Sequence, residues 1–167
     1  MKTLFLVRHA KSSWDHPGLR DHDRPLNERG HRIAPLMATT LQSLGVAPDA
    51  LVSSPAKRAF STAEYFAKAF GKPVADIEIE DDIYEAMPLE IFRVIRQLNA
   101  AWDTVLLFGH NPTFTEVANH FYAGNRIDNM PTCGIVKITA PVEDWRQFER
   151  PAARVSDFWW PKQLGFE

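Results

Sequence analysis

The chain has 167 residues, of which 45% are hydrophobic, and a formal net charge of -2 at neutral pH. This length suffices for one globular domain with a buried core, and we expect residues 1–167 to form a single domain. The small net charge gives no electrostatic reason to expect a nucleic-acid or membrane-surface partner, since either would need a basic face. A lone cysteine, Cys133, excludes an intrachain disulfide and a zinc site built from several thiolates.

The beginning of the chain and the length of its apolar runs bear on its location. The first strand-like segment starts at Lys2, which leaves no room for a signal peptide. The apolar stretches all fall well short of the ~20 residues that span a bilayer. We therefore expect a cytoplasmic protein without a membrane partner.

Short apolar runs alternate with helical patterns along the chain. The runs predict strands at 3–7, 51–53, 77–79, 104–109, 134–139 and 154–158. Between them, apolar residues spaced by three or four positions predict helices over 33–44, 59–70, 91–98 and 114–121. Pro35 lies inside the first helical pattern, where it should kink the helix or move its start to a later residue. The β-α-β alternation predicts an α/β fold with a mostly parallel sheet and helices on both faces.

The tetrapeptide Val7-Arg8-His9-Ala10 closes the first predicted strand. Neighbouring side chains of a strand point to opposite faces, so Arg8 and His9 can reach one ligand only if the backbone leaves β geometry there. The carboxyl ends of strands are where open α/β sheets bind ligands. The polar segment 12–29 follows directly, and an irregular segment of that length is often functional.

A second polar motif follows the second predicted strand. Ser54 is a suitable N-cap and Pro55 a suitable first helical residue, which places Lys57 and Arg58 in or next to the first turn. The helix dipole disfavours cations there, so the pair suggests that an anion lies nearby. The alternative is that both side chains point into solvent at little cost.

A third polar motif, Gly109-His110-Asn111-Pro112, ends the fourth predicted strand. Asn111 can cap the next helix and Pro112 can begin it. A single histidine in such a place is more often structural than catalytic. If the three strand ends meet, however, Arg8, His9, Arg58 and His110 form a pocket of two guanidiniums and two imidazoles, which suits a phosphoryl group.

These motifs, in this order, resemble the histidine phosphatase (phosphoglycerate mutase-like) superfamily. The resemblance rests on Arg8-His9-Ala10, Ser53-Ser54-Pro55, Arg58, Thr62-Ala63 and Gly109-His110-Asn111-Pro112. Within this superfamily, the chain is most similar to the SixA-type phosphohistidine phosphatase branch. This likeness rests on residues 8–14, residues 23–30 and the small size of the chain. The resemblance implies a three-layer α/β/α sandwich with a mostly parallel, mixed central sheet. It also implies a phosphohistidine mechanism that needs no metal and no other cofactor.

The resemblance assigns a role to each residue of the predicted pocket. His9 would be the nucleophile, because a neutral imidazole can attack phosphorus near neutral pH once an acceptor holds its second ring nitrogen. Arg8, Arg58 and His110 would bind the nonbridging oxygens of the phosphoryl group, with a protonated His110 serving best. Substitution of His9 should then abolish turnover.

Two further residues extend the predicted site. Glu85 matches the position where the family's acid glutamate often lies, although an exposed loop carboxylate is an equal interpretation. A phosphohistidine substrate needs no strong acid, because its imidazole leaving group can arrive protonated. Lys11 could add a phosphate-binding donor at the rim or be an ordinary solvated lysine. The histidines and aspartates of segment 12–29 match no standard metal-ligand spacing, so we expect no metal site there.

The sequence therefore favours a phosphatase acting on phosphohistidine in a protein or on a small phosphorylated metabolite. A mutase is less favoured, because the chain has little room for segments that close over the substrate and exclude water. The alternative from another class is a non-catalytic module that binds phosphoprotein, and an intact His9 argues against it. Substrate choice depends on loops such as 12–29. Trp159 and Trp160, near the end of the chain, are expected to pack against the core.

Overall fold

A six-stranded mixed sheet forms the centre of the protein, as seen in a computed structural model that describes residues 1–124 and 126–166. The strands are β1 (Lys2–Arg8), β2 (Ala50–Ser53), β3 (Glu78–Ile79), β4 (Thr104–Gly109), β5 (Ile135–Ala140) and β6 (Arg154–Trp159). Their order in the sheet is β3-β2-β4-β1-β5-β6. Strands β1 to β4 pair in parallel, whereas β5 runs antiparallel to both β1 and β6. All six predicted strands are confirmed, each to within one residue at either end.

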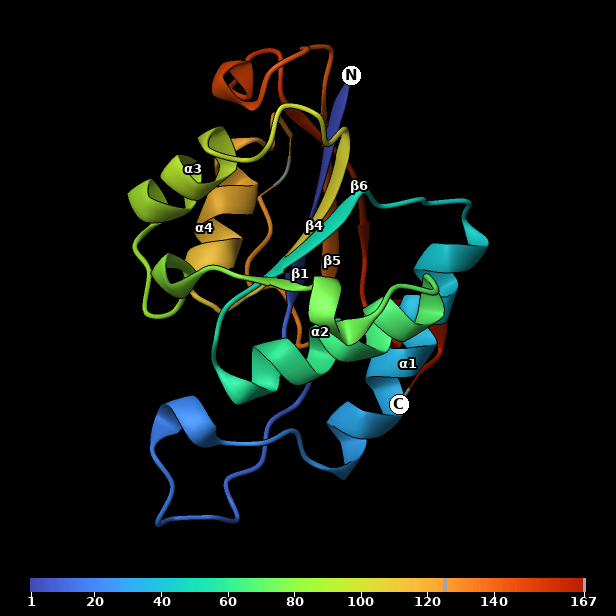
Figure 1. Ribbon diagram of the computed structural model, residues 1–167, viewed down its shortest axis with the longest axis vertical. Helices are drawn as coiled ribbons and strands as arrows, with labels where there is room; N and C mark the ends of the chain where they lie inside the picture. The colour runs from blue at the N-terminus through green and yellow to red at the C-terminus, as the bar shows by residue number, and fades with distance from the viewer. Residues whose placement is uncertain (125, 167) are drawn as a thin grey trace.

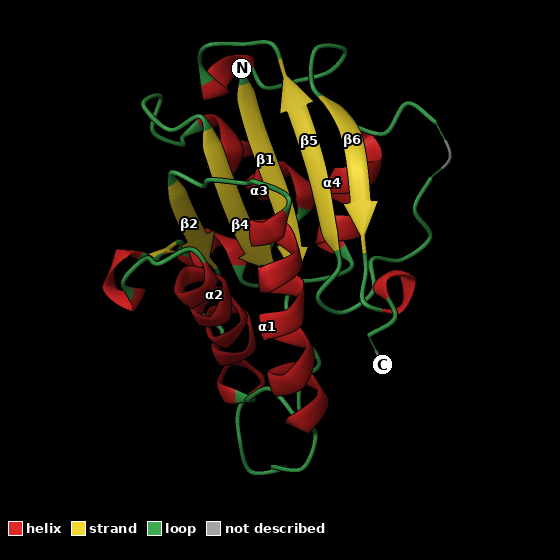
Figure 2. Ribbon diagram, turned by 90° about the vertical axis from the view of Figure 1, so that its right-hand side faces the viewer, coloured by secondary structure: helices red, strands yellow, loops and turns green. Residues whose placement is uncertain are grey.

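Four α-helices cover the two faces of this sheet: α1 (Glu28–Ser43), α2 (Lys57–Ala69), α3 (Pro88–Arg96) and α4 (Thr113–His120). Helices α1 and α2 lie on one face and α3 and α4 on the other (Figure 1, Figure 2). Successive β1 side chains alternate between the layers, with Leu4 and Leu6 in the α3/α4 core and Phe5 and Val7 in the α1/α2 core. The predicted three-layer α/β/α sandwich is therefore confirmed. Within the described residues, no helix has the length and apolar character that a bilayer crossing demands.

Helix α1 continues through Pro35. The alternative of a later start is wrong, because the helix already begins at Glu28, after Asn27 accepts the Gly30 N–H at 2.8 Å. Pro35 removes one backbone hydrogen bond from the helix interior. Burial of an apolar stripe that includes Met37 offsets that loss, since a fully buried side chain of this size contributes about 1.5–3 kcal/mol.

The first turn of α1 packs directly on the backbone that follows β1. A Cβ atom on Gly30 would lie 2.2 Å from the carbonyl oxygen of Lys11, so only glycine fits there. The backbone N–H of Asn27 donates to the same oxygen at 2.9 Å. These contacts fix the path of the chain immediately after His9.

Candidate active site

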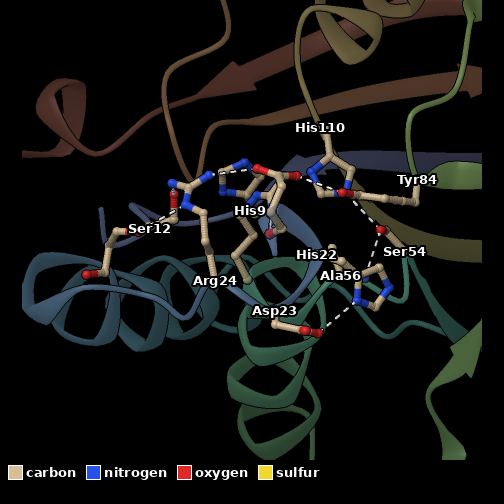
Figure 3. Close-up of polar contacts among 12 residues, drawn as sticks. His9, Ser12, His22, Asp23, Arg24, Ser54, Ala56, Tyr84 and His110 are labelled. Carbon is tan, nitrogen blue, oxygen red and sulfur yellow. Dashed lines mark hydrogen bonds and ion pairs between the residues drawn. The ribbon is translucent and has the colours of Figure 1, made fainter. Parts of the chain in front are cut away.

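Three neighbouring parallel strands end at one edge of the sheet and bring the predicted site together. The β1–β4 register pairs Arg8 with Gly109, so the residues that follow them, His9 and His110, leave adjacent strands at the same level. Ser54 leaves β2, on the other side of β4. The His9 and His110 rings are 5.3 Å apart between centroids, and Figure 3 shows His9 between Arg24 on one side and His110 on the other. The strand ends at Arg8, which is the departure from β geometry that the sequence argument requires.

His9 is buried and held in one orientation by the backbone. Its Nδ1 lies 2.7 Å from the carbonyl oxygen of Ala10, so Nδ1–H donates to that oxygen and the lone pair lies on Nε2. Burial lowers the pKa of His9 to about 4, although the Ala10 hydrogen bond opposes this change. The guanidiniums of Arg58, Arg8 and Arg24 lower the pKa as well. His9 is therefore a neutral imidazole with a free nitrogen at physiological pH.

His110 is also neutral in the free protein, whereas a protonated ring was expected to serve best in binding the phosphoryl group. Burial lowers its pKa to about 3, and the charges of His9 and Arg58 add to this effect. Its Nε2 lies 2.8 Å from Oγ of Ser54, which itself accepts the backbone N–H of Ala56 at 3.2 Å. When the Ser54 hydroxyl donates to Nε2, the proton of the ring lies on Nδ1. His110 can then act as a neutral N–H donor.

The turn after β4 requires a glycine. A Cβ atom on Gly109 would lie 2.4 Å from Cζ of Phe114, so the ring of the following helix occupies that space. Asn111 lies one residue before the N-cap, Pro112, and its Oδ1 accepts the backbone N–H of Thr115 at 3.2 Å and the Thr115 hydroxyl at 2.9 Å. The helix itself begins one residue after Pro112. These contacts fix the backbone on both sides of the second imidazole.

The two cations at the start of α2 have different environments. Arg58 is only 7% exposed, whereas Lys57 is exposed, so the interpretation that both point into solvent is wrong for Arg58. Nη1 of Arg58 donates to the carbonyl oxygen of Asp21 at 2.7 Å, and Nη2 donates to Asp21 Oδ2 at 2.9 Å. The helix begins at Lys57 rather than at Pro55, and Ser54 does not act as its N-cap.

Two buried nitrogen atoms of the site have no hydrogen-bond partner in the part of the chain that the structure describes. They are Nε of Arg8 and Nδ1 of His110. Nη1 of Arg8 donates to the carbonyl oxygen of Met130 at 2.7 Å, which fixes the guanidinium. A buried donor without a partner costs about 1–3 kcal/mol, and an oxyanion would relieve that cost at both atoms.

The structure adds to the site a carboxylate, Asp21, which is exposed to solvent and to which the sequence analysis assigned no role. Asp21 Oδ1 accepts from Nη1 of Arg24 at 3.0 Å, and Oδ2 accepts from Arg58 and from the Tyr84 hydroxyl at 2.7 Å. Burial opposes ionisation of Asp21, but the hydrogen bonds from Tyr84, Arg58 and Arg24 outweigh it and lower its pKa to about 2. Asp21 is thus a carboxylate at neutral pH that connects three segments of the chain.

Arg24 is a further buried cation that the sequence argument missed. Its Nε donates to the carbonyl oxygen of Ser13 at 3.0 Å, and its Nη2 donates to Oγ of Ser12 at 2.6 Å. The guanidinium carbon also lies 3.3 Å from the centroid of the exposed Trp14 ring. The irregular segment 12–29 therefore folds around Arg24 and places its charge beside His9 (Figure 3).

Glu85 and Lys11 lie outside this group of hydrogen-bonded side chains. Glu85 is exposed and directly follows Tyr84, with a φ of 55° in the left-handed region. Such a conformation is strained for a residue other than glycine and often occurs at functional sites. Lys11 is exposed and lines a separate cavity. The acid role of Glu85 and the phosphate-binding role of Lys11 both stay predictions.

Comparison with known proteins identifies the family. Residues 4–90 match the histidine phosphatase superfamily (branch 1). The chain belongs to this superfamily. An uncharacterized chloroplastic protein of Arabidopsis thaliana is 31% identical over 154 residues, covering 87% of this chain and 70% of that protein.

Solved structures of the superfamily share the whole fold. A protein of Agrobacterium tumefaciens described as a phosphohistidine phosphatase, SixA, is 29% identical, with a TM-score of 0.80 over 96% of this chain and 98% of that chain. A protein histidine phosphatase SixA complexed with tungstate gives a TM-score of 0.82 over 97% of this chain and 99% of that chain. At 21% identity, this second likeness concerns the fold alone. The SixA-type, phosphoglycerate mutase-like resemblance is confirmed, and with it the expectation of a phosphatase.

Proposed function

We propose that this protein is a metal-independent phosphohistidine phosphatase in which His9 carries the phosphoryl group covalently. The main support for this proposal is the geometry of His9. Its Nδ1–H donates to the Ala10 carbonyl, which leaves Nε2 free, and the guanidiniums of Arg58, Arg8 and Arg24 are near enough to lower its pKa. Because burial holds the pKa of His9 at about 4, the attacking nitrogen is unprotonated without help from a general base.

In the first proposed step, Nε2 of His9 forms a bond to phosphorus while the bond between phosphorus and the leaving group breaks in line. Arg8, Arg58 and the N–H of His110 bind the nonbridging oxygens and stabilise the charge they carry. In the second step, a water oxygen attacks the phosphohistidine, the bond between phosphorus and nitrogen breaks, and phosphate is released. His9 returns to its neutral form, and the water proton leaves with the products.

The leaving group favours phosphohistidine over a phosphoester. An imidazole can leave already protonated, whereas an alkoxide needs a proton from an acid. The proposed donor for an ester is Glu85, which is exposed next to Tyr84. We therefore propose a phosphorylated protein as the partner, in agreement with the phosphohistidine phosphatase description of the Agrobacterium relative.

A small-molecule phosphomonoesterase is the second candidate function. It is supported by phosphoserine phosphatase 1 of Hydrogenobacter thermophilus, which is 38% identical over 98 residues, or 54% of this chain and 44% of that protein. The strained backbone of Glu85 is the structural feature that favours it. A cytoplasmic setting is part of the proposal, since the buried thiol of Cys133 suits a reducing compartment.

The proposal is tested by hydrolysis of a phosphohistidine peptide and a chromogenic phosphoester, each with and without a chelator. We expect hydrolysis that resists chelation, faster turnover of the peptide, and no turnover by His9→Ala. Arg58→Ala should lose at least ~100-fold in kcat/KM, while the matched control Lys57→Ala, one residue away and exposed, should stay within about twofold.

Other outcomes separate the alternatives. Preferred turnover of the ester, lost in Glu85→Gln, would favour the small-molecule phosphatase. Peptide binding without phosphate release would favour a binding module. Undiminished hydrolysis by His9→Ala would refute the proposed mechanism.

A further inference from the structure

A second cavity lies at the same edge of the sheet as the phosphate pocket, over strands β5 and β6 rather than β2 and β4. Its volume is about 210 Å³. Three stretches of chain at that edge line it: Lys11 after β1, residues 131–133 before β5, and residues 160–162 after β6. The first turns of α1 close it with Arg29 and Ile33. None of the hydrogen-bonded residues of the phosphate pocket lines this cavity.

The cavity is lined by three cations and no anion, in a chain whose net charge is negative. The exposed cations are Lys11 in the segment after β1, Arg29 in α1 and Lys162 after β6, and the lining contains no carboxylate. Within the described residues, none of these three side chains has an acidic partner within 4.0 Å. Cations gathered around one hollow repel one another, and an anion bound among them removes that cost.

The walls between these cations are flat and apolar. Trp160 is half-buried, and its ring is held against Phe158 with 4.6 Å between centroids. Its backbone N–H donates to Oε1 of Gln163 at 3.2 Å, and Pro131 and Pro161 supply rigid neighbouring surfaces. A half-buried tryptophan of fixed orientation offers a face on which a planar group can stack. Trp160 thus lines the cavity in addition to the packing role expected of it.

The volume limits what can enter. The cavity's volume of about 210 Å³ lies below the ~300–1,000 Å³ of typical pockets for drug-sized ligands. An α-helix of a partner protein, about 10 Å across, does not fit. A small molecule with a single planar ring and one or two anionic groups does.

We propose that this cavity binds a small organic dianion with a planar apolar body, at a site separate from the phosphate pocket. The same residues connect it to the nucleophile. The backbone N–H of Cys133, on the cavity lining, donates to the carbonyl oxygen of His9 at 3.0 Å, and Lys11 lies two residues after His9. A ligand in the cavity would therefore lie beside the backbone that holds His9 without competing for phosphate, and this second part rests on the proposed function.

Phthalate is a suitable probe, since it has one ring, two carboxylates and no phosphoryl group to hydrolyse. In ¹H–¹⁵N spectra it should shift the indole N–H signal of Trp160, assigned by its loss in Trp160→Phe, in a saturable manner. Succinate, which lacks the ring, and benzamide, which lacks the charge, should each bind at least about fivefold more weakly. Absence of a saturable shift with phthalate would overturn the proposal.

Charge-reversal variants test the location. Arg29→Glu and Lys162→Glu should each weaken phthalate binding at least about fivefold, while Lys68→Glu, an exposed reversal on α2, should leave it unchanged. Well-dispersed ¹H–¹⁵N spectra would show that each variant is folded. Lys162→Met is a milder variant, because it removes the charge of Lys162 without reversing it. Equal binding by all these variants would place phthalate elsewhere and refute the site.

Two controls separate this proposal from the enzymatic one. His9→Ala should bind phthalate as the unmodified protein does, whether or not the protein hydrolyses phosphohistidine. Vanadate, a phosphate mimic, should not displace phthalate, and phthalate should not act as a competitive inhibitor of hydrolysis. Displacement by vanadate, or purely competitive inhibition, would show that phthalate occupies the phosphate pocket and would refute a separate site.

Discussion

On the acid side of the pH–rate profile, activity should be lost at a much lower pH than the pKa of an ordinary histidine would give. His9 must be unprotonated to attack phosphorus, and burial lowers its pKa from 6.5 to about 4. At about pH 5, ~3% of an ordinary imidazole but ~90% of His9 is unprotonated, a ~30-fold difference in competent enzyme. Activity should therefore persist as the pH falls below 6.5 and should be lost as the pH passes through about 4.

The assay combines kinetics with direct titration. We would measure kcat/KM from about pH 3.5 to about pH 8, since this parameter reports the pKa values of the free enzyme. The substrate has its own phosphate ionisation at a pKa of about 6, so a parallel NMR titration of the His9 ring is needed to separate the two. The signals of His9 are assigned by their loss in His9→Gln.

A substitution at Arg24 tests the cause of the shift. Arg24 is one of the cations that lower the pKa of His9, so Arg24→Gln should raise this pKa and move the acid limb to higher pH. Arg32→Gln, at an exposed position on α1, is the matched control and should leave the pKa of His9 unchanged. Titration of His9 near 6.5 in the unmodified protein would refute the reasoning.

Three further substitutions test individual contacts. Asp21→Asn should lower kcat/KM about tenfold, because an amide oxygen accepts more weakly than a carboxylate from the two guanidiniums of Arg24 and Arg58. Asp23→Asn is the control and should leave kcat/KM unchanged in the same steady-state measurement. Gly30→Ala should lower the free energy of unfolding in denaturant by about 1–3 kcal/mol, because the added Cβ would meet a backbone oxygen. Gly18→Ala is the control: open space surrounds Gly18, so the free energy of unfolding should change by less than about 0.5 kcal/mol. Lys2→Met should lower the free energy of unfolding by about 2–4 kcal/mol, because it leaves two backbone carbonyls without their donor. It should leave kcat unchanged, because Lys2 lies at the end of β1 away from the site, and a loss of kcat would contradict this.

The sequence was enough to predict the sheet, its layers and the meeting of the three strand ends. Parallel strands align their carboxyl ends, so polar residues directly after them, such as His9 and His110, must lie close together. Asp21 and Arg24 escaped prediction because they lie in the irregular segment 12–29, where no hydrophobic period indicates which side chains turn inward. The hydrogen bonds of Asp21 to Arg58 and Tyr84 exist only once α2 and the loop at Tyr84 are in place, and Arg24 bonds to Ser12 and Ser13 only once the segment has folded back on itself.

The protonation state of His110 could not be predicted from the sequence either. Sequence reasoning favoured a protonated His110, because a cation is the better partner for a phosphoryl group. Burial and the neighbouring positive charges make the neutral form more stable, and both depend on tertiary structure. The difference between Arg58 and Lys57 has the same origin, since adjacent helical residues point in different directions and only packing decides which one is buried.

The stereochemical course at phosphorus tests most directly whether the phosphoryl group passes through His9. The substrate would carry a phosphoryl group made chiral with sulfur and oxygen isotopes, and the configuration of the released thiophosphate would be determined. Transfer to His9 and then to water is two in-line displacements, each of which inverts the phosphorus, so the account predicts overall retention. Overall inversion would show that water attacks the substrate directly and would contradict a covalent intermediate on His9.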